Sequence, residues 1–332
     1  MDSPDVQQVF FQHLKEKLPM HVSLVDEIAD FLNISTDSAY RRIRGDKAVS
    51  FPELQKLCVR YKISLDSFFH LHGDSFVFTS QLKSNTETSF EEWIEILLAQ
   101  LQLFDSYKEK HLYYLLKDIP PYVHFLMPEL VRFKIFFWMK SILGYPALKG
   151  VRFDLHDVRY EKFEPIAKKI TELYVRIPMT EIWNPESIDS TLRQIHFYRE
   201  AGSFTNKAHI DVLYDRVEAL VNHLEKQAEC GLKFLPGSAP TTASAEYNLY
   251  VNELILGDNT IFVKLDNTRI TFLNYAVLYI AYTQDERFNN VMNDNLTNLI
   301  TKSMMISRSG EKEREKFFNK LREKITEYRS FR

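Results

Sequence analysis

Apolar residues near the amino terminus come in short helical runs that are separated by tight polar breaks. Ile28 and Leu32 share one helical face. Asn33 then interrupts the pattern, and Ala39 and Ile43 share the face of the next run. Asn33 is one of the few residues that tolerate the left-handed conformation of a sharp turn. Two short helices joined by a short turn form a helix-turn-helix unit, which this pattern predicts.

Capping signals extend this unit into a compact head of five helices. Ser50-x-x-Glu53 is a capping-box pattern, which predicts a helix start at Ser50. Ser64 is a candidate cap for a short fifth helix. The predicted helices of the head are 4–18, one from residue 23 or 24, the second helix of the pair at about 35–45, one from residue 50, and 64–69.

After a linker at 73–88, helical periods dominate the larger C-terminal region, 89–332. The helices predicted there are 89–104, 108–117, 130–143, 165–176, 187–201, 206–231 and 309–329. Beyond a flexible stretch at 237–244 the period changes to two residues, which predicts a small antiparallel β meander at about 246–275. The expected fold class is mainly α: an N-terminal five-helix head, residues 1–72, and a larger helical C-terminal region that carries this β meander.

Two apolar patterns in the C-terminal region admit two interpretations. Apolar residues at 210–224 repeat every three and four positions, as in a dimer seam or an intramolecular core. Two heptads are fewer than a coiled coil requires, so we favour the core. The aromatic residues between Trp93 and Trp183 could line a ligand pocket or fill a helical core, and again we favour the core.

Positive charge is concentrated on and just after the second helix of the pair. Residues 40–47 carry four cations against one anion, Asp46, for a net charge of about +3. Residues 1–35 carry two cations and six anions, or about −4. The whole chain has a formal net charge of −3, so the case for a nucleic-acid partner depends on the local patch. Neutralisation of phosphates by such a patch supplies most of the sequence-independent affinity for DNA.

These features resemble the phage-repressor-like (Cro/XRE-type) helix-turn-helix regulators over residues 4–70. The matching residues are Ile28, Ala29, Leu32, Ile34, the helix start Ser35-Thr36-Asp37-Ser38, Gly45, Ser50-Phe51-Pro52-Glu53-Leu54 and Tyr61-Lys62-Ile63-Ser64-Leu65-Asp66. Asn33 replaces the commoner turn glycine. Arg42 stands at a position that is usually apolar in the family, and we expect Ile43 to take over its packing one residue later.

The resemblance implies that the second helix of the pair enters the major groove of DNA with its N-terminal part. The residues expected at base edges are Thr36, Asp37, Tyr40 and Arg41. Arg41 suits a bidentate contact with guanine. The residues expected at phosphates, which position the protein without specifying a sequence, are Ser38, Arg42, Arg44 and Lys47.

The expected function is sequence-specific DNA-binding transcription regulation. We expect a homodimer on double-stranded DNA, because one recognition helix contacts few base pairs, with half-sites about 34 Å apart. The C-terminal region would dimerise and could bind a small-molecule or protein effector. The alternative is a protein-interaction or scaffold protein that keeps a vestigial helix-turn-helix head.

Enzymatic, metal and membrane functions find little support in the sequence. It contains no GxSxG, HExxH or phosphate-binding glycine loop, so we expect no catalytic residues and no cofactor. Cys58 and Cys230 are far apart, which argues against a disulfide framework or a cysteine-based zinc site. The acidic, polar start of the chain is unlike a secretory leader, and the apolar run at 270–284 is too short to span a membrane. We therefore expect a cytoplasmic protein.

Overall fold

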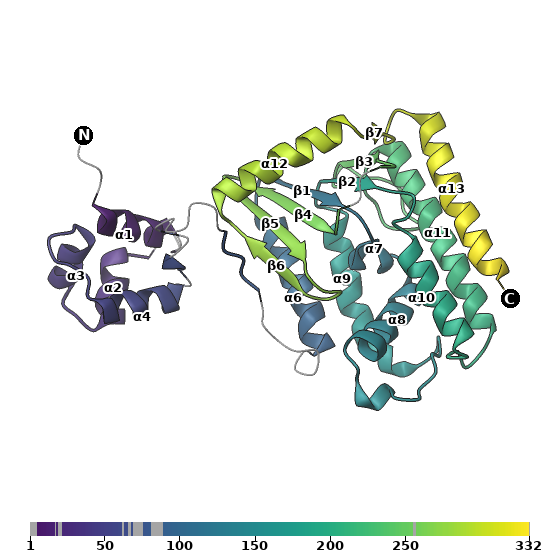
Figure 1. Cartoon of the computed structure of the whole chain (residues 1–332), viewed down its shortest axis with the longest axis horizontal. Helices are drawn as coiled ribbons and strands as arrows, with labels where there is room; N and C mark the ends of the chain where they lie inside the picture. The colour runs from purple at the N-terminus through teal and green to yellow at the C-terminus, as the bar shows by residue number, and fades with distance from the viewer. Residues whose placement is uncertain are drawn as a thin grey trace. The chain divides into compact units, whose positions relative to one another are not determined.

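The chain divides into two compact units, which are called the head, Met1–Val77, and the body, Phe78–Arg332 (Figure 1). The computed structural model describes residues 5–16, 18, 22–61, 63–65, 68, 76–80, 89–254 and 257–331. Most of the linker predicted at 73–88 and half of the fifth helix predicted at 64–69 lie outside these residues. The boundary between the units falls within the predicted linker.

Four helices of the head begin close to their predicted starts. These are α1 (Val6–Glu16), α2 (Leu24–Leu32), α3 (Thr36–Ile43) and α4 (Phe51–Tyr61). Their apolar faces meet in a small core around Phe11, Ile28 and Leu57. Ala29 of α2 and Ala39 of α3 are both buried, and their small side chains allow the two helices to pack closely.

The body contains a mixed sheet that the sequence analysis did not predict. Its seven strands, counted over the described residues, are β1 (Lys110–Leu115), β2 (Met179–Trp183), β3 (Tyr247–Val251), β4 (Thr260–Leu265), β5 (Thr268–Asn274), β6 (Ile280–Thr283) and β7 (Met304–Met305). Their order in the sheet is β6-β5-β4-β1-β2-β3-β7. Strands β1, β2 and β3 are parallel, and the other pairs are antiparallel. The expected mainly α fold with a small meander is therefore wrong, and the protein is α/β.

The predicted three-stranded meander is wrong because β3 does not pair with β4. Strand β3 pairs in parallel with β2, with Tyr247 opposite Met179, and β1 and β2 separate it from β4. The hairpin of β4 and β5 is present, and Asp266 in its turn has a φ of 43°. The segment 108–117, which was predicted as a helix, is instead β1 at the centre of the sheet.

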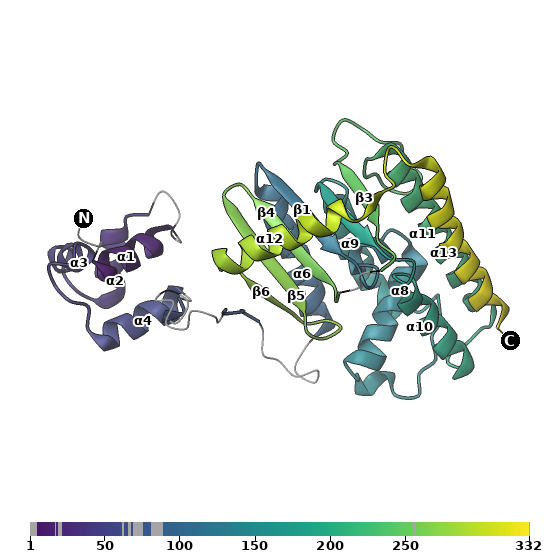
Figure 2. The same ribbon diagram turned by 45° about the horizontal axis from the view of Figure 1, so that its top comes forward.

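Helices cover both faces of the sheet (Figure 2). The helices of the body are α6 (Phe90–Ser106), α7 (Pro121–His124), α8 (Pro128–Phe137), α9 (Glu164–Tyr174), α10 (Asp189–Glu200), α11 (Ala208–Cys230), α12 (Glu286–Thr301) and α13 (Glu311–Ser330), with short π and 3-10 turns at Trp138–Ile142, Pro146–Leu148 and Val158–Phe163. Helix α12 crosses one face, where Leu296 packs with Ile182 and Phe262. Helices α6 and α9 pack against each other on the opposite face.

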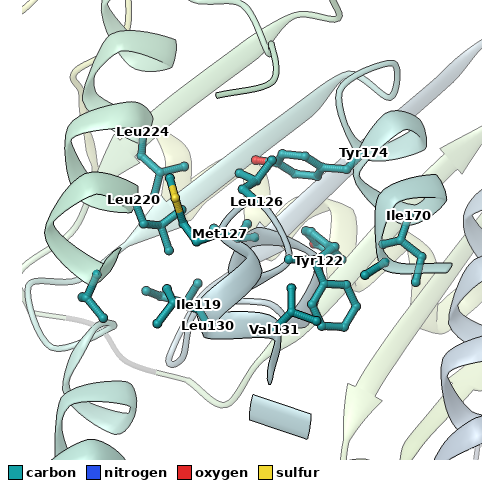
Figure 3. Close-up of a cluster of buried hydrophobic side chains, with 14 of the residues drawn as sticks. Ile119, Tyr122, Leu126, Met127, Leu130, Val131, Ile170, Tyr174, Leu220 and Leu224 are labelled. Carbon is teal, nitrogen blue, oxygen red and sulfur yellow. The ribbon is translucent and has the colours of Figure 1, made fainter. Parts of the chain in front are cut away.

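One large core fills the space between the sheet and these helices (Figure 3). The apolar residues of 210–224 are buried in it, as the preferred interpretation predicted; they are Ile210, Leu213, Val217, Leu220 and Leu224. The aromatic residues also pack on one another, with the Phe133 ring 5.5 Å from that of Phe153 and 5.8 Å from that of Tyr198.

No described helix combines the length and the apolarity that a bilayer crossing needs.

Candidate nucleic-acid interface

The turn between α2 and α3 is closed by hydrogen bonds. Asn33, directly after α2, has the left-handed conformation with φ 54° and ψ 52°. The amide of Ile34 donates to the carbonyl of Ala29 at 3.0 Å, which satisfies one of the last carbonyl groups of α2. Ser35 then caps α3, because its Oγ accepts a hydrogen bond from the amide of Ser38 at 3.2 Å. These contacts set the direction in which α3 leaves α2.

Helix α3 has one face inside the head and one face in solvent. At about 100° per residue, Ala39 and Arg42 fall on the same side, and both are buried. The residues on the opposite side, which span an arc of about 140°, are all exposed: Thr36, Asp37, Tyr40, Arg41 and Arg44. These five residues are called the outer face of α3. All four expected base-edge residues lie on it.

Arg42 does not lie where we expected it. Its Nη2 donates to Glu53 Oε1 at 2.7 Å, and its Nε donates to Glu53 Oε2 at 3.3 Å. Its Nη1 donates to the carbonyl of Ser38 at 3.1 Å and to Ser38 Oγ at 2.6 Å. Arg42 is 5% exposed, so this guanidinium serves the interior of the head rather than a phosphate. Ile43 is half-buried and packs against the core of the head, as we expected, but Arg42 beside it also turns inward.

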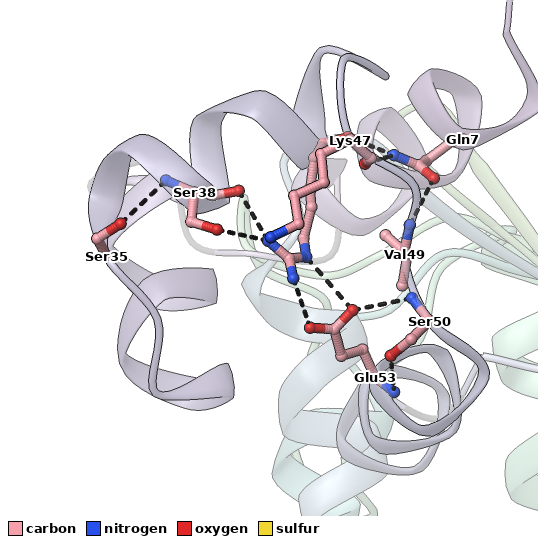
Figure 4. Close-up of polar contacts among 8 residues, drawn as sticks. Gln7, Ser35, Ser38, Lys47, Val49, Ser50 and Glu53 are labelled. Atoms are coloured by element: carbon pink, nitrogen blue, oxygen red, sulfur yellow. Dashed lines mark hydrogen bonds and ion pairs between the residues drawn. The ribbon is translucent and has the colours of Figure 1, made fainter.

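Glu53 connects α3 to α4 (Figure 4). The amide of Ser50 donates to Glu53 Oε2 at 2.8 Å, and the amide of Glu53 donates to Ser50 Oγ at 3.4 Å, which is the predicted capping box. Burial alone would raise the pKa of Glu53. Hydrogen bonds from Arg42 and Ser50 outweigh that effect and hold the pKa below its ordinary value. The ionised carboxylate therefore caps α4 and pairs with the inward cation of α3.

Gln7 of α1 holds the end of α3 and the loop that follows it (Figure 4). Its Nε2 donates to the carbonyls of Arg42 at 2.7 Å and Lys47 at 2.8 Å. Its Oε1 accepts a hydrogen bond from the amide of Val49 at 2.9 Å. One amide side chain thus bonds to three backbone groups at and after the end of α3, and it sets the course of the chain that carries Lys47.

Gly45 allows the same loop to approach α1 closely. Its φ is +84°, a conformation that side-chain-bearing residues rarely adopt. A Cβ atom at this position would lie 2.4 Å from Oδ2 of Asp5. The neighbouring carbonyl of Arg44 accepts a hydrogen bond from Gln8 Nε2 at 2.7 Å. The match to the family's glycine at this position therefore has a steric reason.

The outer face and the loop after it carry exposed cations. Arg41, Arg44 and Lys47 are all exposed, and Asp46 is the anion within 40–47. Since Glu53 neutralises Arg42, the charge that this segment presents to a partner is about +2 rather than +3. The Arg44 guanidinium lies 5.7 Å from the centre of the Tyr40 ring, and it is 3.8 Å from Asp46.

A comparison with protein-family models, curated proteins and solved structures found no match to this chain. The resemblance to the phage-repressor-like regulators therefore rests on the residues of 4–70. The geometry of α2, the turn and α3 is the physical evidence that accompanies it.

Residues with metal-ligand chemistry do not assemble in the described part of the chain. No group of three or more His, Cys, Asp or Glu side chains there could hold a metal ion. Asp154 accepts a hydrogen bond from the amide of His156 at 2.9 Å, and Asp157 caps the 3-10 turn that follows. These carboxylates serve local structure.

Three positioning residues were not anticipated from the sequence: Gln7, Gln8 and the second role of Glu53. The glutamines gave no signal, because polar residues are ordinary on the first turn of a surface helix. Arg42 did give one. A cation at an apolar position of α3, with an acid at the start of the next helix, is the pattern of a buried ion pair.

Proposed function

We propose that this protein is a sequence-specific DNA-binding transcription regulator. The observation that carries the proposal is the outer face of α3, on which Thr36, Asp37, Tyr40 and Arg41 are exposed together. Arg44 and Lys47 follow at its C-terminal end. Helix α3 is packed against the head on its inner side and is cationic on its outer side. Major-groove recognition requires such a helix.

The buried position of Arg42 changes the assignment of contacts. Arg41 reaches a guanine through its bidentate donor pair, and Thr36 and Tyr40 contact neighbouring base edges. Arg44 and Lys47 neutralise phosphates. Arg42 supports recognition indirectly, because its pairing with Glu53 keeps α3 in the orientation that presents the outer face.

A homodimer on double-stranded DNA follows from the size of the recognition element. Helix α3 has eight residues and is about 12 Å long, so one copy contacts only a few base pairs. Two heads related by a two-fold axis would bind half-sites about 34 Å apart. The body would supply the dimer contact and the binding of an effector. We also propose a cytoplasmic location, because regulators of the phage-repressor type meet their DNA there.

Selection of bound fragments from a random double-stranded DNA library, with the full chain, tests this function. We expect a palindromic sequence and retention that weakens steeply with salt. On the selected sequence Arg41→Ala should reduce affinity by about 5- to 150-fold, and it should have little effect on random DNA. Lys47→Ala should weaken both equally and lower the salt slope by about one. Lys169→Ala, an exposed cation of α9, is the control for loss of one charge.

Two results would contradict the proposal at different levels. Equal losses for Arg41→Ala on selected and random DNA would reject the base contact. Absence of any salt-dependent retention by the wild-type chain would reject DNA binding itself. Tight capture of a partner protein would then favour the alternative of a scaffold protein with a vestigial head.

A further inference from the structure

Asp37 is an anion in an unexpected place. Within residues 36–44, all of which the structure describes, it is the one acidic residue. It lies in the first turn of α3, on the outer face and one turn before Arg41. Its carboxylate forms no hydrogen bond or ion pair with any side chain in the described ranges. Within the head, its one favourable interaction in the described ranges is with the N-terminus of α3.

Phosphate contact cannot be the role of this side chain. A carboxylate accepts hydrogen bonds and donates none near neutral pH, and it is repelled by the DNA backbone. On a surface that binds DNA by charge alone, Asp37 would lower affinity for every sequence. The N-terminus of α3 favours an anion at this position, but only a donor on the floor of the groove would make the carboxylate favourable for DNA binding.

The major groove offers one base whose edge suits a carboxylate. Cytosine presents its N4 amino group as a donor with no acceptor on the same edge. Adenine also has an amino donor, but the N7 acceptor beside it repels a carboxylate. Guanine and thymine present acceptors, O6 with N7 and O4 respectively. A carboxylate in the groove therefore attracts cytosine and disfavours the other three bases.

The spacing of Asp37 and Arg41 extends this chemistry to two neighbouring contacts. Residues four apart are about 6 Å apart along a helix axis, which is close to the rise of two base pairs at about 3.4 Å each. Both side chains belong to the outer face. One presents an acceptor and the other presents paired donors.

We propose that Asp37 is a specificity determinant whose carboxylate accepts a hydrogen bond from the N4 amino group of a cytosine, no more than about two base pairs from the guanine bound by Arg41. This inference rests on the proposed DNA-binding function. It assigns two opposite effects to one side chain: Asp37 strengthens binding to the operator and weakens binding to all other DNA.

Parallel selections with the wild-type chain, Asp37→Ala and Asp37→Asn test the proposal. Asp37→Ala should lose the cytosine preference at one position of each half-site, a change of about 10-fold, and should bind random duplex more tightly than the wild type. Asp37→Asn should change the preferred base from cytosine to adenine, because an amide donates to N7 and accepts from N6. The wild-type selection alone reports whether the protein binds DNA specifically.

Asp26→Ala is the matched control, because Asp26 is an exposed aspartate in the first turn of α2. It removes the same charge and the same favourable interaction with a helix N-terminus, and it should leave base preference unchanged. If Asp37→Ala selects the wild-type sequence and changes only thermal stability, Asp37 merely stabilises the start of α3 and the proposal is overturned. If the wild-type chain selects no sequence, the proposed function and this inference both fail.

Discussion

In the head, three of the four cations of residues 40–47 are exposed, whereas several charged groups of the body are buried in its core. Arg41, Arg44 and Lys47 are exposed on and after α3, and the inward Arg42 is neutralised by Glu53. In the head, the Arg42–Glu53 ion pair thus stabilises the fold itself. The other cations of this segment remain on the surface, where a polyanion can reach them.

The body uses its buried charges for its own fold. Glu181 of β2 accepts hydrogen bonds from Trp183 Nε1 at 2.7 Å and from the Tyr247 hydroxyl at 2.8 Å. Lys233 donates to the carbonyl of Tyr174 at 3.1 Å, at the C-terminal end of α9. Burial raises the pKa of Glu181 and lowers the pKa of Lys233 to about 7. Neither side chain is exposed, so neither can meet a partner at the surface.

This difference shows why a count of charges along a sequence is a poor guide to function. A cation contributes to the binding of an anionic partner only if it is not already neutralised by an ion pair within the protein. Substitutions of the inward cation of the head, of a buried cation of the body and of the turn before α3 can test this difference.

The largest effect is expected from Arg42→Leu. This variant leaves the Glu53 carboxylate without its buried partner, which should cost the head about 3 kcal/mol. Hydrogen exchange followed by mass spectrometry on the full chain should show that protection of α3 and α4 collapses. Tryptophan fluorescence should show an unchanged body, because Trp93, Trp138 and Trp183 all belong to it.

A double variant separates the ion pair from simple packing. Arg42→Leu with Glu53→Gln supplies the apolar residue that is usual in the family at this position, and glutamine can still complete the capping box with Ser50. We expect it to recover most of the lost protection, since apolar replacements of buried ion pairs are often nearly neutral. If α3 and α4 are as well protected in Arg42→Leu as in the exposed-site variant Arg41→Ala, the Arg42–Glu53 pair does not stabilise the head.

The second prediction concerns Lys134 of α8, whose Nζ donates to Thr191 Oγ1 at 2.9 Å and Gln194 Oε1 at 2.8 Å. Burial lowers the pKa of this ammonium to about 7, against the attraction of Asp118. The ordinary pKa of lysine is about 10.4. Between these values the unfolded chain holds more protons at this group than the folded chain does. Stability of the body should therefore rise with pH above 7, and Lys134 contributes at most about 1.4 kcal/mol per pH unit to that rise, beside the contribution of Lys233.

Lys134→Met removes the contribution of Lys134 and leaves that of Lys233. Urea unfolding followed by tryptophan fluorescence should give a free energy of unfolding whose rise between pH 7 and 8.5 is smaller than in the wild type by about 2 kcal/mol. Lys169→Met, at an exposed position of α9, should reproduce the wild-type profile. A wild-type profile that is flat or falls over this range would show that Lys134 keeps an ordinary pKa in the folded chain.

Local signals explain why the head was predicted more closely than the body. Caps and turns act within a few residues, so Ser35, Ser50 and Asn33 could be assigned from their neighbours alone. The orientation of Arg42 depends on Glu53, eleven positions further along the chain, so the two residue types hint at a pair but only the structure shows its geometry. Ile43 packs against the head core as expected, but the inward orientation of Arg42 was missed for this reason.

The sheet of the body could not be predicted because its central strands lack a surface period. Both faces of β1 are covered, so Tyr113 and Tyr114 are each at least half-buried although they point in opposite directions. A continuous apolar run is compatible with a helix or a buried strand. Strand β2 is short, with Thr180 and Glu181 at its centre, yet all five of its residues are buried. Its partners β1 and β3 are distant in sequence.

The smallest effect should come from the turn that presents α3, and it brings the two units into direct comparison. Helix α2 ends at Asn33, with a φ of 54°, whereas α11 in the body ends at Gly231, with a φ of 64°. Glycine adopts this conformation without strain, but it also gives the unfolded chain more freedom. Asn33→Gly should therefore stabilise the head by about 0.5 kcal/mol, and Asn33→Ala should destabilise it by about 1 kcal/mol. Exchange protection of α2 in the full chain measures both changes. A loss of protection in the glycine variant would mean that the asparagine side chain, and not only its backbone conformation, holds the turn.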